Sequence, residues 1–101
     1  MVHGGVTLDL REGFDGDEVW IRAAGMPDIH LAAVSTKLQI GRARSLALPE
    51  AVQALDIEVP RRGALTRIAL LPQRPLWVGV SLSRDGRRLD VRQQLEAFGY
   101  V

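Results

Sequence analysis

The sequence predicts one two-layer antiparallel β-sandwich of seven or eight short strands, spanning residues 1–101. Three observations predict this fold class. Several short segments alternate strictly between apolar and polar residues, which is the period of a half-buried strand. Turn-forming pairs such as Asp85-Gly86 separate these segments. The length of 101 residues suits a single domain, and 47% hydrophobic residues are enough to fill one core.

The N-terminal third contains three predicted strands. Residues 6–11 alternate strictly between apolar and polar side chains, which predicts a strand, and Val19–Arg22 is expected to form the next strand. The glycines and aspartates of residues 13–17 predict a turn between them. Residues 24–28 predict a second turn, which leads into a short strand around Ile29–Leu31.

The middle of the chain, residues 34–54, shows no clean period. We expect a strand from Val34 that leads into a loop at Gly41, followed by a short strand at Ser45–Leu48. Residues 49–55 contain good helix formers, but about two helical turns are marginal in isolation. This last stretch is therefore expected to be a turn or a single helical turn.

Regular alternation returns in the C-terminal half. The break at Pro60–Gly63 predicts a hairpin, and Asp85-Gly86 predicts a second one. Residues 93–101 follow as a tail. The expected strands are 55–59, 65–70, 76–82 and 88–92. The residues expected to point inward are Val6, Leu8, Leu10, Val19, Ile21, Leu55, Ile57, Val59, Ile68, Leu70, Val78, Val80, Leu89 and Val91.

Composition excludes several classes of function. The net charge is +1, with 13 basic and 12 acidic residues, whereas nucleic-acid binders usually carry a clear basic excess. The chain has no cysteine, which rules out disulfides and zinc–thiolate sites and favours a cytoplasmic location. No window reaches the roughly 18 apolar residues of a membrane helix, and the first residues do not suggest a signal peptide. We expect no nucleic-acid or membrane partner.

No motif in the sequence indicates a reaction. His30 is expected to point outward from a short strand, without a second histidine nearby. The cluster Asp15-Gly16-Asp17-Glu18 offers oxygen ligands for a hard cation, but it lacks EF-hand spacing and is interpreted as an acidic turn. No serine lies in a Gly-x-Ser-x-Gly context. The sequence therefore predicts no catalytic residues, metal site or cofactor, and the protein is not expected to be an enzyme.

Arginines gather near two predicted turns. Arg61 and Arg62 lie in one turn, and Arg84, Arg87 and Arg88 surround the other. If both turns share one end of the sandwich, they form a cationic rim able to meet phosphate, carboxylate or an acidic partner. The simpler interpretation is ordinary solvated charge on surface turns.

The two tryptophans are the strongest candidates for a binding surface. Aliphatic residues flank each of them in a predicted strand, so alternation turns the indoles of Trp20 and Trp77 away from the core. Arg22 lies beside Trp20 on the same face, placed for a cation–π contact. Gly79 and Ser81 follow Trp77 on its face and leave a shallow hollow beside the ring. These five residues form the predicted binding set.

Burial of aromatic surface is favourable, so something should cover these rings. One alternative is the chain itself, through residues 34–54 or the tail 98–101. A second alternative is another subunit or a protein partner, and a third is a ring-stacking ligand such as a sugar. The first expected function is therefore a non-catalytic protein-interaction or self-association module, using the tryptophan surface or an exposed strand edge. The alternative is a small-ligand, carbohydrate-type binding domain.

Three segments of the chain carry a family resemblance. Leu10–Phe14, Leu76–Val80 and residues 98–101 resemble those of small uncharacterised bacterial proteins. The strand rhythm is also similar to that of immunoglobulin-like and transthyretin-like accessory sandwiches. The resemblance implies a sandwich fold in a bacterial protein, but it implies no activity, cofactor or site residue.

Overall fold

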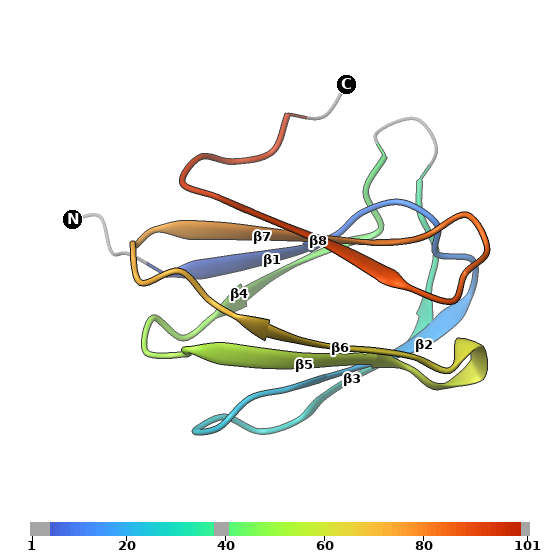
Figure 1. The fold of residues 1–101 in the computed structure, drawn as a ribbon, viewed down its shortest axis with the longest axis horizontal. Coiled ribbons are helices and arrows are strands. Elements are labelled where there is room, and N and C mark those ends of the chain that lie inside the picture. Colours follow the sequence, from blue (N-terminus) through green and yellow to red (C-terminus); the bar gives the residue numbers. More distant parts are fainter. Residues whose placement is uncertain (1–4, 38–40, 100–101) are drawn as a thin grey trace.

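The computed structural model describes residues 5–37 and 41–99, and these residues form eight β-strands and one turn of 3-10 helix (Figure 1). None of the described residues belongs to a helix long and apolar enough to cross a membrane. The last two residues of the predicted tail lie outside the described residues. The elements are β1 (Val6–Leu10), β2 (Asp17–Arg22), β3 (Ile29–Val34), β4 (Arg44–Leu48), β5 (Ala54–Val59), η1 (Pro60–Arg62), β6 (Ala64–Ala69), β7 (Leu76–Leu82) and β8 (Leu89–Gln94).

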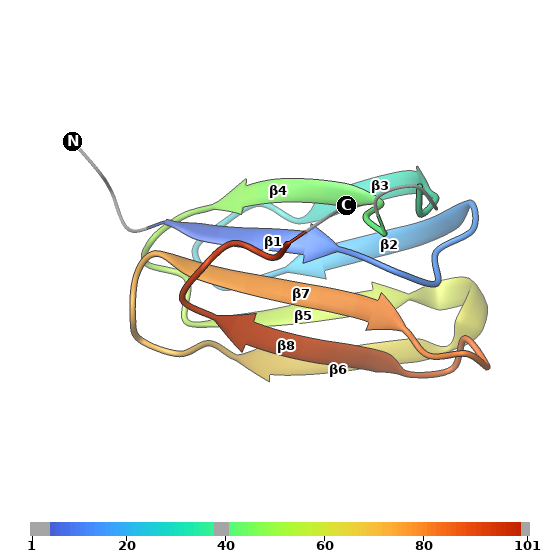
Figure 2. The ribbon, with the colours of Figure 1, turned by 90° about the horizontal axis from the view of Figure 1, so that it is seen from above.

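The strands form two four-stranded sheets that lie against each other (Figures 1 and 2). One sheet has the order β4-β1-β7-β8 and the other has the order β3-β2-β5-β6. Every pairing between these strands is antiparallel except that of β1 with β7, which is parallel. The prediction of an all-β, two-sheet fold is confirmed. The expectation of wholly antiparallel pairing is wrong at this one pair, because β4 lies antiparallel on one side of β1 and β7 runs parallel to β1 on its other side, after a crossover through β5 and β6 in the other sheet.

The core lies between the sheets and is filled by the inward-pointing residues of both sheets, which alternate with outward-pointing residues along the strands. In β2 and β5, for example, buried and partly exposed residues alternate strictly along the strand. Eleven of the residues expected to point inward are buried: Val6, Leu8, Leu10, Val19, Ile21, Leu55, Ile57, Val59, Ile68, Val78 and Val80.

Three of the residues expected in the core are less buried than predicted. Val91 is 38% exposed, and Leu70 and Leu89 are half-buried. Val91 and Leu89 belong to β8, which pairs only with β7 and so lies at the edge of its sheet. Leu70 follows the last residue of the edge strand β6. An alternating pattern identifies the inward side of a strand, but it does not show whether the opposite sheet extends far enough to cover it.

The middle segment contains one strand and no helix among its described residues. Val34 ends β3, and a single bridge between Lys37 and Arg42 precedes β4. The short strand expected at residues 45–48 is confirmed, because β4 pairs antiparallel with β1. The following stretch is a turn, closed by a 3.2 Å hydrogen bond from the Val52 N–H to the Pro49 carbonyl.

The edges of the two sheets are joined by the side chain of Gln93. Its Nε2 donates to the Ala69 carbonyl at 3.0 Å, and its Oε1 accepts from the Leu71 N–H at 2.9 Å. Gln93 belongs to β8, whereas Ala69 ends β6 in the other sheet. A single side-chain amide therefore occupies two backbone groups at an open strand edge, where an added strand would otherwise pair.

Candidate interaction surfaces

Trp20 and Arg22 lie on the outer surface of the β3-β2-β5-β6 sheet, which we call the Trp20 face. Trp20 is opposite His30 on β3 and opposite Glu58 on β5, and Glu58 is in turn opposite Leu65 on β6. One row of four side chains therefore crosses the whole sheet. Leu65, at the end of this row, is 67% exposed.

The Trp20 indole is half-buried by its neighbours on this face. The His30 ring stacks on it, with ring centroids 4.3 Å apart and an interplanar angle of 30°. The Arg22 guanidinium carbon lies 4.8 Å from the indole centroid, which confirms the predicted cation–π contact. The outward orientation predicted for Trp20 is also confirmed, since Val19 and Ile21 on either side are buried.

Charged side chains on the Trp20 face are paired, but the balance between them is acidic. Arg22 lies 3.0 Å from Glu58 and 3.5 Å from Asp28. Arg67 grips Asp56 with two hydrogen bonds of 2.7 and 2.9 Å. The hydrogen bond from Arg67 lowers the pKa of the Asp56 carboxyl, although desolvation acts in the opposite direction. Among the described residues, the face carries four carboxylates and two guanidinium groups, from Glu18, Asp28, Asp56, Glu58, Arg22 and Arg67.

The contact between His30 and Glu18 was missed by the sequence reasoning. His30 was correctly expected to be exposed, but the structure places its Nε2 2.7 Å from a Glu18 carboxylate oxygen. These residues lie on paired strands, and a register irregularity separates Asp17 from Val19 in β2. Glu18 and His30 come together because of the pairing register of β2 with β3, and the sequence does not reveal the irregularity in that register.

Trp77, Gly79 and Ser81 lie on the outer surface of the other sheet, which we call the Trp77 face. The flanking Leu76 and Val78 are buried, so the outward orientation predicted for Trp77 is confirmed. The two tryptophans consequently lie on opposite sides of the sandwich. The five residues of the predicted binding set do not converge on one site.

The hollow beside Trp77 is filled by the C-terminal tail. Phe98 packs over Gly79 and is only 7% exposed (the tail crosses this side of the molecule in Figure 1). A Cβ atom at Gly79 would lie 2.8 Å from Phe98 Cζ, so only glycine leaves room for the ring. The Arg11 guanidinium carbon lies 4.5 Å from the centre of the Phe98 ring. The tail therefore fills the hollow predicted beside Trp77, at Gly79.

Trp77 itself remains half-exposed and borders an open cavity. The cavity has a volume of about 510 Å³. Glu50 supplies a carboxylate there, and its other lining residues are Gly5, Val6, Thr7, Ala47, Leu48, Pro75 and Trp77. Ser81, farther along the same face, is occupied by its own chain, because its Oγ accepts a 3.2 Å hydrogen bond from the Glu12 N–H.

The two arginine-bearing turns share one end of the sandwich, as the cationic-rim hypothesis required (Figures 1 and 2). The turn between β5 and β6 contains η1, and the Arg62 side chain from this turn lies against Gly86 in the turn between β7 and β8. We call these two turns, residues 60–63 and 83–88, the arginine-rich end. Four of its arginines are exposed, and their guanidinium groups make no hydrogen bond or ion pair with the described residues: Arg61, Arg84, Arg87 and Arg88.

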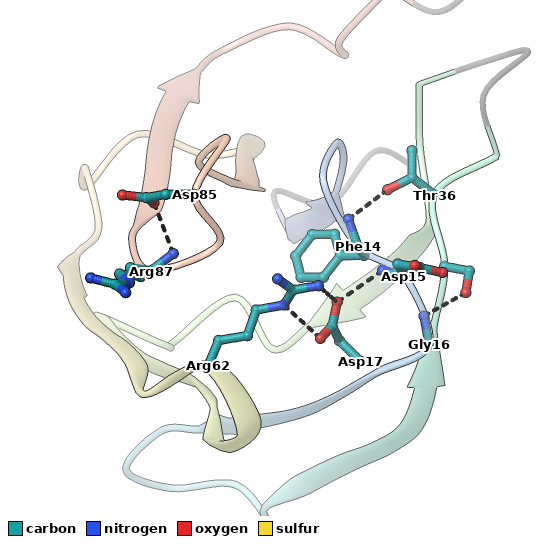
Figure 3. A network of polar contacts seen from close by, with 9 residues as sticks. Phe14, Asp15, Gly16, Asp17, Thr36, Arg62, Asp85 and Arg87 are labelled. Atoms are coloured by element: carbon teal, nitrogen blue, oxygen red, sulfur yellow. Dashed lines mark hydrogen bonds and ion pairs between the residues drawn. The ribbon is translucent and has the colours of Figure 1, made fainter.

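Arg62 is the exception at this end, because it binds a buried carboxylate (Figure 3). Its Nε and Nη2 donate to the two carboxylate oxygens of Asp17 at 2.7 and 3.2 Å. The Asp15 N–H donates to the same carboxylate at 2.8 Å. Burial alone would raise the pKa of the Asp17 carboxyl, but the hydrogen bonds from Arg62 and Asp15 outweigh it and lower that pKa.

The acidic turn at residues 15–18 does not gather its carboxylates. Asp17 points to Arg62, whereas Glu18 points to His30 on the Trp20 face. Across residues 5–37 and 41–99, no group of three or more His, Cys, Asp or Glu side chains is close enough to hold a metal ion.

Comparisons of the chain with protein-family models, with curated proteins and with solved structures give no match. Its function must therefore be inferred from the surfaces described above.

Proposed function

We propose that the protein is a non-catalytic interaction module that self-associates, with the Trp20 face of one copy contacting the arginine-rich end of another. Tryptophan and arginine are the residue types most enriched at energetic centres of protein interfaces. Charge complementarity sets the orientation of such contacts and speeds their formation.

The observation that carries this proposal is the contrast between the two outer faces. The tail covers part of the Trp77 face, whereas no described segment crosses the Trp20 face (Figure 1). Trp20 and Leu65 are nevertheless large apolar side chains in one row of that sheet. Docking of a partner would remove their apolar surface from water.

The arginine-rich end supplies the complementary charge. The guanidinium groups of its four exposed arginines make no hydrogen bond or ion pair with the described side chains, while the Trp20 face has more carboxylates than guanidinium groups among the described residues. A contact between a face and an end is heterologous, so it joins copies in rings or open chains rather than in two-fold symmetric dimers. The interaction should weaken as salt screens these charges.

Light scattering over a concentration series tests the proposal. Between about 10 µM and about 1 mM, where weak interfaces form, we expect the average mass to rise without a plateau at the dimer. The rise should disappear in about 0.5 M salt. Trp20→Ala and Arg87→Glu should stay monomeric, and thermal melts confirm that each variant is folded.

Trp77→Ala is the matched control, because it removes the other indole from the opposite face. It should associate as the wild type does. A wild-type protein that remains a monomer throughout the series contradicts the proposal. Association that depends on Trp77 rather than on Trp20 contradicts it as well.

The cavity beside Trp77 favours a second candidate, a small-ligand site of carbohydrate type. An indole next to a carboxylate and the Thr7 hydroxyl offers a stacking surface together with hydrogen-bonding groups. Saturable quenching of tryptophan fluorescence by a sugar would support this function. Loss of that quenching in Trp77→Ala, with retention in Trp20→Ala, would locate the site.

We propose that the sandwich is of the transthyretin-like rather than the immunoglobulin-like type. In immunoglobulin constant-type domains the first strand lies beside the second in one sheet. Here β1 lies between β4 and β7, and β2 belongs to the other sheet. An experimental structure in which β1 pairs with β2 would contradict this assignment.

We further propose a cytoplasmic location, since many extracellular domains of this size depend on disulfides and the chain contains no cysteine. Fractionation of the native cells would test this location, and recovery of the protein outside the cytoplasm would overturn it.

A further inference from the structure

A glycine in the middle of a four-stranded sheet creates a hollow on the Trp77 face. Gly79 lies in β7 between Asp9 of β1 and Arg92 of β8. These neighbours carry side chains and Gly79 carries none, so the floor of the hollow is backbone. The Phe98 ring occupies this space in close contact with the position that a Cβ would take.

The hollow is suited to an aromatic ring. Arg11 bounds it twice: its guanidinium carbon lies 4.5 Å from the ring centre, and its Cδ would lie 2.9 Å from a Cβ at Gly79. The flat backbone floor accepts the face of a ring, and the guanidinium supplies a cation–π interaction that an aliphatic side chain cannot make. Both features select for an aromatic side chain.

The described part of the tail that supplies this ring, residues 95–99, makes few other contacts with the sheets. Leu95, Glu96, Ala97 and Gly99 are all exposed. No hydrogen bond or ion pair joins residues 95–99 to either sheet, apart from one between the Gln94 side chain and the Glu96 carbonyl at the start of the tail itself. Within residues 95–99, Phe98 is therefore the buried side chain that packs against a sheet, and its displacement breaks no strand pairing.

Beside the hollow, the Trp77 face continues with the Trp77 indole and an open cavity, which a ligand longer than one side chain could contact. Trp77 lies two residues from Gly79 on the same face of β7, a spacing of about 7 Å. Beyond it lies the open cavity lined by Thr7, Ala47 and Pro75. Residues that flank an aromatic anchor in a partner peptide would lie along this indole and reach the cavity.

We infer that the hollow over Gly79 is a binding site for an aromatic side chain of a partner peptide, and that the chain's own Phe98 occupies it as a displaceable internal ligand. The site lies on the opposite side of the sandwich from the Trp20 face, so it does not depend on the self-association proposed above. Only molecules whose Phe98 has left the hollow can bind the ring of a partner, so the apparent affinity for the partner is reduced in proportion to the fraction of such molecules.

A fluorescence titration of the 101-residue chain tests this site. Trp20→Phe in every protein leaves Trp77 as the single tryptophan and the reporter beside the hollow. The probe is a synthetic peptide with the sequence of residues 95–101 in which alanine replaces Tyr100, and the control peptide has alanine at the position of Phe98 as well, so that only the probe carries an aromatic ring. We expect saturable binding of the probe to the Phe98→Ala chain, and affinity about ten-fold or more weaker for the chain that retains Phe98.

A second substitution separates the hollow from the rest of the face. Gly79→Val in the Phe98→Ala chain fills the hollow with a side chain and should abolish binding of the probe. Equal binding of the probe and the alanine peptide would overturn the inference. Absence of binding to a folded Phe98→Ala chain would overturn it too.

If the Phe98→Ala chain does not fold, the chain with Phe98 still decides the question. Excess probe should then displace the tail and shift the Gly79 amide resonance in a saturable manner, whereas the alanine peptide should not. A Gly79 resonance unmoved by the probe would refute the site. Light scattering of the same samples keeps this result separate from self-association through the Trp20 face.

Discussion

Removal of the Arg62 side chain should destabilise the fold through the carboxylate that it leaves behind. The Asp17 side chain is only 5% exposed, and Arg62 donates two of the three hydrogen bonds that its carboxylate accepts from the described residues. Loss of one partner from a buried pair typically costs about 3–5 kcal/mol. Arg62 itself is 32% exposed, so water can reach part of the gap, and we expect about 2–3 kcal/mol for Arg62→Ala.

Urea unfolding measures this loss directly, and thermal unfolding should show a fall in Tm of about 10–20 °C for a domain of this size. Arg61→Ala is the matched control, because this neighbouring arginine is exposed and should cost less than about 0.5 kcal/mol. The double variant Asp17→Ala/Arg62→Ala should be more stable than the sum of the single losses predicts. Equal stability of Arg61→Ala and Arg62→Ala, or simple additivity in the cycle, would refute the reasoning.

Three further predictions concern acid stability, the core and a turn. Because folding lowers the pKa of Asp17, this carboxylate stabilises the fold above its unfolded pKa of about 3.9, and the stabilisation is lost as the pH falls below that value. The urea midpoint of Asp17→Asn should therefore depend less on pH than that of the wild type between about pH 4 and pH 2. Parallel curves of midpoint against pH would contradict this. Val80→Ala should cost about 2 kcal/mol in urea unfolding, whereas its cross-strand neighbour Val91, which is 38% exposed, should tolerate alanine at less than half that cost. Gly13→Ala and Gly25→Ala both place alanine at a positive φ, which costs about 1–2 kcal/mol. Of the two, only Gly13→Ala would also bring a Cβ to 2.6 Å from a carbonyl oxygen. The Tm of Gly13→Ala should therefore fall further than that of Gly25→Ala.

Local pattern was sufficient to predict most of the strands and most of the core. The alternation in residues 55–59 reports the two sides of β5 because that strand is central and covered on its inner side. The same alternation overestimated the burial of Val91, because burial at a sheet edge depends on the opposite sheet. Pairing of β1 with β7 depends on strand order, which no local signal encodes.

The candidate surfaces were predicted only in part, for the same reason. Period-two alternation placed Trp20 and Trp77 outward, and both are outward. It contains no information on which sheet each strand joins, so it did not reveal that the two indoles face opposite directions. The cover over Gly79 comes from Phe98, a contact between residues far apart in the sequence that only the folded tail reveals.

The bridge formed by Gln93 has a consequence for how this cysteine-free chain keeps its layers together. A primary amide neither titrates in the physiological range nor reacts with thiols or oxidants. The two hydrogen bonds between Gln93 of β8 and the end of β6 therefore do not depend on pH or redox conditions. Replacement by glutamate would keep an acceptor for the Leu71 N–H but would turn a second oxygen toward the Ala69 carbonyl. The contact between this side chain and the Ala69 carbonyl would then be lost when the carboxylate is ionised and restored when it is protonated.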